Sequence, residues 1–147
     1  MSVSTEAVLA LWTEQREQMR QSESQRAVLT NYVLVIAAGL SGLVAQQRFA
    51  PSTIPVCVLI ILLGLYGALS AAKYGERANY HLSQARALVK TLVAAGVLGP
   101  DTELDDARQQ HYRAFPRLYK IRLHWLWTGL HMGVAGYGVF LLILTLT

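Results

Sequence analysis

Three long stretches of the chain contain no Asp, Glu, Lys or Arg: residues 27–47, 49–72 and 123–147. Each stretch has at least 21 residues, and an α-helix needs roughly 20 apolar residues to cross the hydrocarbon core of a bilayer. Helices of soluble proteins are mostly shorter, at about 10–14 residues, so burial in a soluble core explains these stretches less well. Only 15% of all residues are charged, against about 25% in a typical soluble domain. The sequence therefore predicts an all-α membrane protein with three transmembrane spans.

The charged residues divide the chain into alternating polar and apolar segments. We expect a cytoplasmic helix over 1–26, span 1 over 27–46, an outer turn over 47–53, span 2 over 54–72, a cytoplasmic helical section over 73–122 and span 3 over 123–146. No Gly or Pro precedes Gly39, so the first helix should run unbroken into the membrane. The second should continue to about Ala95, where Gly96 can end it. Pro116 should kink a third long helix, so three long helices with cytoplasmic extensions are predicted.

The basic residues predict the orientation. Of the 13 Lys and Arg, twelve lie before span 1 or between spans 2 and 3, and only Arg48 lies in the outer turn. The positive-inside bias then places the N-terminus and 73–122 in the cytoplasm and the C-terminus on the outer side of the membrane. The acidic residues within 1–26 do not suit a cleavable signal peptide, so span 1 should remain as a signal anchor. Lys and Arg are scattered singly among acids and Gln, which argues against direct nucleic-acid binding.

Catalytic and metal-binding patterns are not found in the sequence. The histidines at 81, 111, 124 and 131 are not spaced by three or four residues, as a helical metal site requires. The single cysteine, Cys57, lies inside span 2 and is expected to be a packing residue. We therefore expect no enzyme activity, metal or cofactor.

Small residues recur at helical spacing within the spans. They are Ala38 and Gly42 in span 1, Gly64, Ala68 and Ala71 in span 2, and Gly129, Gly133 and Gly136 in span 3. Lipid provides no hydrophobic force between helices, so association depends on the close backbone approach that small residues permit. These residues either pack the spans of one protomer or contact a neighbouring protomer, and we expect a homo-oligomer in the lipid bilayer.

Three polar residues in or next to the spans, Asn31, His131 and Arg48, are candidates for a pore or for polar contacts. His131 either bonds to a neighbouring helix or lines a pore. Arg48 either forms a ring of charge in a cyclic oligomer or anchors to headgroups. A cytoplasmic surface for a signal or a defence partner is expected at Arg77, His81, Arg86, Lys90, Arg108 and Arg113.

The charged helix after span 2 contains Tyr74-x5-Tyr80-His81-x4-Arg86. With the preceding two-span hairpin, this run resembles the SLATT type of small bacterial membrane effectors over roughly residues 8–95. The third span departs from a two-span plan and is similar to RipA-type oligomeric membrane proteins and to membrane accessories of type VI CRISPR loci. The resemblance implies an oligomeric, pore-like effector of the bacterial inner membrane that perturbs membrane integrity or potential in antiphage defence, without catalytic residues. The alternative is a non-conducting scaffold that recruits a cytoplasmic partner through 73–122; a small transporter would need a broken helix or a charged site at mid-membrane, and neither is evident.

Overall fold

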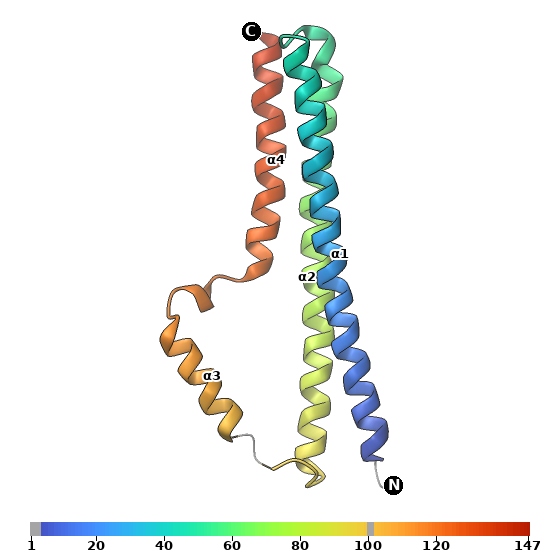
Figure 1. Cartoon of the computed structure of the whole chain (residues 1–147), viewed down its shortest axis with the longest axis vertical. Helices are drawn as coiled ribbons and strands as arrows, with labels where there is room; N and C mark the ends of the chain where they lie inside the picture. The colour runs from blue at the N-terminus through green and yellow to red at the C-terminus, as the bar shows by residue number, and fades with distance from the viewer. Residues whose placement is uncertain (1–3, 100–101) are drawn as a thin grey trace. The chain divides into compact units, whose positions relative to one another are not determined.

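The computed structural model describes residues 4–99 and 102–147, and within them it contains helices but no strand. The four α-helices are α1 (Thr5–Gln46), α2 (Ile54–Ala94), α3 (Thr102–Ala114) and α4 (Leu123–Leu146), and short 3-10 helices occupy Pro51–Thr53 (η1) and Leu118–Lys120 (η2) (Figure 1). The helical segments Thr5–Gln46, Pro51–Ala94 and Leu123–Leu146 are long and apolar enough to cross a membrane. The predicted all-α class with three candidate spans is thus confirmed at the level of the helices.

The chain forms two compact units, and α1 and α2 each contribute to both. The apolar unit contains residues 23–75 and 123–147, and the charged unit contains the described residues up to 22 together with those of 76–122. The division falls close to the predicted limits of the charge-free runs. The apolar unit therefore contains only four charged residues, Glu23, Arg26, Arg48 and Lys73.

The two long helices α1 and α2 have the predicted extent. Neither is interrupted where its charged part meets its apolar part. After α2 the backbone turns left-handed at Gly96, with φ of 72°. The Gly96 and Val97 N–H groups donate to the carbonyls of Val93 and Leu92, each at 3.0 Å. This is the glycine-ended helix cap that the sequence predicted.

The prediction of a third long, kinked helix is wrong. α3 ends at Ala114, and α4 begins at Leu123 after the short helix η2. Pro116 lacks a backbone N–H, and its ring disfavours helical backbone at the residue before it, Phe115. The chain therefore leaves the helix at Phe115 instead of bending through it, and the described residues form four α-helices. The start of α4 coincides with the predicted start of span 3.

The turn between α1 and α2 is tight and contains two left-handed residues. Arg48 and Phe49 have φ of 51° and 57°, and the Phe49 N–H donates to the Val44 carbonyl at 3.1 Å. The Thr53 hydroxyl donates to the Ala50 carbonyl at 2.7 Å. The turn thus satisfies several backbone groups locally and leaves Arg48 exposed.

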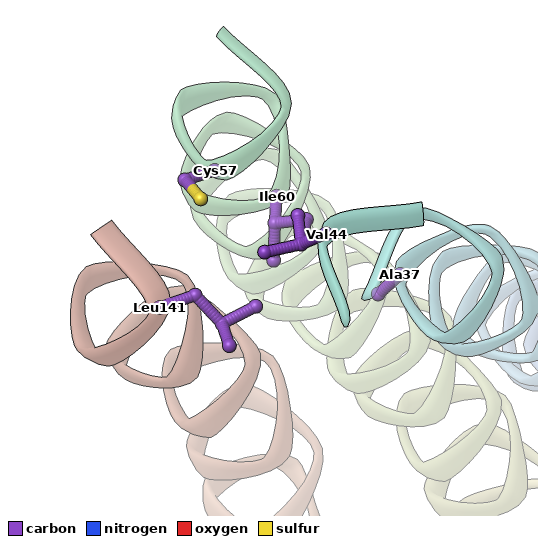
Figure 2. Packing of buried hydrophobic residues seen from close by; sticks show 5 residues of the cluster. All are labelled: Ala37, Val44, Cys57, Ile60 and Leu141. Atoms are coloured by element: carbon purple, nitrogen blue, oxygen red, sulfur yellow. The ribbon is translucent and has the colours of Figure 1, made fainter. Parts of the chain in front are cut away.

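A small apolar core joins the three long helices of the apolar unit. Figure 2 shows its buried members: Ala37 and Val44 from α1, Cys57 and Ile60 from α2, and Leu141 from α4. The burial of Cys57 confirms the prediction that it is a packing residue. Most apolar side chains remain outside this core, since only 22%, 33% and 28% of the residues in the three most apolar windows are buried. An apolar surface of this extent on one chain marks contact with lipid or with another protein.

Candidate functional site

The small residues of α2 are used within the chain. Gly64, Ala68 and Ala71 are all buried. A Cβ atom added at Gly64 would lie 2.7 Å from the Cα atom of Ala135, so α2 and α4 approach at backbone distance. On the partner helix, a Cβ added at Gly138 would lie 2.8 Å from Cγ1 of Ile61. Gly64 of the predicted stripe therefore packs against α4 of the same chain.

The predicted small residues of α1 and α4 lie elsewhere. Ala38 and Gly42 on α1 are exposed, as are Gly129, Gly133 and Gly136 on α4. A Cβ added at any of these four glycines would meet no atom within 4 Å. We call Ala38 and Gly42 the open face of α1, and the three glycines the open face of α4. None of these four glycines therefore forms a close helix contact within the chain.

Other residues of α1 and α4 make the contacts. α1 packs through Val33, Ala37 and Val44, and α4 packs through Ala135 and Leu141. Successive residues of an α-helix are about 100° apart. The open face of each helix is therefore turned well away from its packing face.

One residue of each open face lines a groove between α1 and α4. The groove has a volume of about 590 Å³, and its lining consists of Leu34, Ala37, Ala38, Ser41, Leu130, Gly133, Val134 and Tyr137. Ala38 and Gly133 come from the two open faces. A helix of another molecule could approach the backbone closely here, because both residues are small.

His131 is completely buried and joins α4 to α1. Its Nε2 atom lies 3.1 Å from the hydroxyl oxygen of Thr30, and that hydroxyl donates to the Arg26 carbonyl at 2.9 Å. Because the hydroxyl has one proton, the imidazole N–H must be the donor to Thr30. The Nδ1 atom has no hydrogen-bond partner and lies against Gly67. Of the two predicted roles of His131, a bond to a neighbouring helix and pore lining, the geometry within one chain is that of the bond. Asn31, another predicted polar residue, is exposed.

Arg26 is buried where the first apolar run begins. Only 5% of it is exposed, and its guanidinium carbon lies 5.2 Å from the centre of the Trp127 ring. Neither Nε of Arg26 nor Nε1 of Trp127 has a hydrogen-bond partner. The sequence pattern did not single out Arg26 or Trp127 as site residues; the available signal was a basic residue immediately before a charge-free run.

In the charged unit, α1 and α2 are joined by polar contacts. The ring Nδ1 of His81 lies 2.7 Å from Oε1 of Gln15, and Arg77 donates to Gln18 at 3.5 Å. These two members of the predicted signal surface therefore have contacts within the unit. Arg113 is exposed on α3.

The remaining three predicted residues, Arg86, Lys90 and Arg108, line a groove that we call the basic groove. Its volume is about 660 Å³, and its other lining residues are Trp12, Arg16, Leu82, Ala85, Val89, Val93 and Ala94. The guanidinium of Arg16 lies 5.8 Å from the centre of the Trp12 ring. None of the described residues that line the groove is acidic. A groove lined by apolar and basic side chains suits a ligand that is both apolar and negatively charged.

No three His, Cys, Asp or Glu side chains among the described residues come together as metal ligands. Comparison with protein-family models, with curated proteins and with solved structures finds no match.

Proposed function

We propose that α1, α2 and α4 insert into the bacterial inner membrane, with the charged unit in the cytoplasm and the C-terminus outside. The length and apolar composition of the three helices support insertion. The exposed side chains of the apolar unit add to this, since Val35 and Leu69 are 70% and 73% exposed. The basic residues support the orientation, because Arg48 alone is on the outer side.

Within the membrane the protein is a homo-oligomer that associates through the open faces of α1 and α4. The observation that carries this proposal is that these faces are unused inside the chain, although their residues permit the closest helix approach. Helix association in lipid needs such van der Waals contact, since burial from water supplies no driving force there. The groove between α1 and α4 provides the contact site on each protomer.

The oligomer acts as a membrane effector. The basic groove of the charged unit binds an acidic ligand, and the assembled spans then perturb membrane integrity or potential. The position of the groove along α1 and α2 supports this coupling, because both helices continue without a break into the apolar unit. The resemblance to SLATT-type effectors, antiphage function included, points in the same direction.

Overexpression in bacterial cells with a membrane-potential dye tests the effector function, because a high concentration favours assembly by mass action. The wild-type chain should depolarise the cells. Gly133→Leu, which fills the open face of α4, should insert equally well and leave the potential near its resting value. An unchanged potential with correctly inserted wild-type protein would contradict the proposal.

A non-conducting scaffold is the second candidate, and one observation favours it. His131 lies inside the apolar helix α4, and it is enclosed within the chain and bonded to Thr30. It is therefore not available to line a channel between protomers without rearrangement. A scaffold would recruit its cytoplasmic partner through the basic groove, and vesicles containing the purified oligomer would retain an encapsulated dye.

A further inference from the structure

Arg26 carries a positive charge at a buried position of α1. Its residue surface is 95% covered, and its Nε atom is enclosed without a hydrogen-bond acceptor. Within the part of the chain that the structure describes, no carboxylate forms an ion pair with it. A buried charge is unfavourable unless an opposite charge and hydrogen bonds compensate for it. Nη1 and Nη2 of Arg26 are not among the enclosed atoms, so an anion could reach them and compensate for the buried charge.

The surroundings of Arg26 hold its guanidinium in place. The Trp127 ring lies on one side, with 5.2 Å between the guanidinium carbon and the ring centre. Gly75 of α2 lies on another side, since a Cβ added there would be 3.8 Å from Nη1 of Arg26 and 3.1 Å from Cβ of His124. A side chain at position 75 would narrow this space. Residues of three helices thus surround the guanidinium, and we call these surroundings the notch.

Trp127 adds a second donor to the same notch. Its indole Nε1 is also enclosed and has no acceptor. An indole N–H can only donate a hydrogen bond, and so can every N–H of a guanidinium. Two neighbouring side chains that offer only donors suit a ligand that offers only acceptors. A phosphate group has several acceptor oxygens and matches the planar fork of arginine.

The notch lies at the depth of the lipid headgroups in the proposed orientation. Arg26 immediately precedes the first charge-free run, and Trp127 lies within the first turns of α4. Phosphates of the cytoplasmic leaflet are found at this level, where tryptophan and arginine side chains of membrane proteins also concentrate. We propose that Arg26 and Trp127 form a binding site for the phosphate group of an anionic phospholipid. An anionic lipid fits better than a zwitterionic one, because its phosphate charge is not offset by its own headgroup.

Native mass spectrometry of the full-length protein, purified in detergent and titrated with phosphatidylglycerol, tests the site. Arg26→Gln should retain the lipid about tenfold less well, the loss expected when one charged hydrogen-bonding group is removed. Arg20→Gln is the matched control, because it removes the same charge from the same helix at an exposed position. The control should bind as the wild type does. Phosphatidylcholine should bind more weakly than phosphatidylglycerol to the wild-type protein.

A second variant covers the possibility that Arg26→Gln does not fold. Arg26→Lys keeps the charge but loses the planar surface that stacks on the indole, so an intermediate loss is expected. A further measurement follows the fluorescence of Trp127 and needs no change at Arg26. With Trp12 and Trp125 replaced by phenylalanine, Trp127 is the one tryptophan of the three that remains, and its emission should shift when phosphatidylglycerol is added.

Equal retention by Arg26→Gln and Arg20→Gln would overturn the site. Release of the lipid by millimolar glycerol phosphate would overturn the lipid source and assign the notch to a soluble phosphate. A change in oligomer mass in Arg26→Gln, with unchanged lipid retention, would assign the missing anion to a neighbouring protomer and also overturn the proposal. The inference rests on the proposed membrane insertion, whose own failure is distinguishable: the protein would then remain soluble without detergent.

Discussion

The contact between α2 and α4 provides a quantitative test of the packing in the apolar unit. In Gly64→Ala, the new Cβ would lie 2.7 Å from Cα and 2.8 Å from Cβ of Ala135. Ordinary carbon contacts are about 3.5–4.0 Å long, so the helices would have to separate by roughly 1 Å. The obstructing atoms belong to the backbone and to Cβ, and no rotamer change can remove them. Overpacking of this kind costs about 1–3 kcal/mol.

Gly39→Ala is the matched control for this prediction. It makes the same chemical change within an apolar helix, but a Cβ at Gly39 would meet no atom within 4 Å. Any gain in helix propensity is common to both variants, so their difference isolates the packing term. Gly64→Ala should be less stable than Gly39→Ala by about 2 kcal/mol, measured by adding SDS to the protein in mild-detergent micelles and following the unfolding by tryptophan fluorescence. Equal unfolding midpoints would refute the close approach of α2 and α4.

Three further predictions concern single side chains. In Thr30→Val, the buried ring N–H of His131 loses its acceptor, so the apolar unit should lose about 1–3 kcal/mol of stability in the same SDS titration. Thr30→Ser, which keeps the hydroxyl, should retain most of that stability. An unchanged stability of Thr30→Val would argue against the hydrogen bond. In Arg86→Gln, the affinity for a fluorescent acidic peptide should fall severalfold and become less salt-dependent. Arg113→Gln, which lies outside the basic groove, should bind the peptide as the wild type does. An equal loss of affinity in both variants would show that net charge, and not the groove, determines binding. Cys57 is fully buried, so a maleimide should label it slowly in mild detergent and rapidly in SDS, and rapid labelling in both would contradict the packed core.

The helices could be predicted from the sequence because charge is excluded from long runs for a simple physical reason. A charged side chain is costly in the hydrocarbon core, so the runs that begin at 27, 49 and 123 are visible without any knowledge of packing. The break between α3 and α4 could not be predicted with equal certainty. Pro116 is compatible with either a kink or an end of the helix, and the outcome depends on whether neighbouring groups satisfy the freed backbone.

The use of the small residues could be predicted for one helix only. On α2, Gly64 of the small stripe lies against the backbone of Ala135, and Gly67, which was not included in the predicted stripe, lies against the ring of His131. On α1 and α4 the packing faces include larger residues such as Val44 and His131, so small size alone did not identify them. A stripe of small residues indicates where a close approach is possible, but the partner decides which stripe is used.

The basic groove was predicted in part. Arg86 and Lys90 are one helical turn apart, so their common face on α2 could be read from the sequence. Trp12 and Arg16 also line the groove, although about seventy residues separate them from the α2 residues that line it. Contacts at such a separation depend on how α1 and α2 pack, which spacing within one helix does not reveal.

Cysteine crosslinking in native membranes tests the central claim, that copies of this chain associate through the open face of α4. On a Cys57→Ser background, Gly133→Cys should form an intermolecular disulfide under mild oxidation and give a covalent dimer on a denaturing gel. Met132→Cys lies at the same depth but about 100° around the helix, at an exposed position, and should crosslink far less. Absence of a dimer in both variants, or equal dimer in both, would contradict the account.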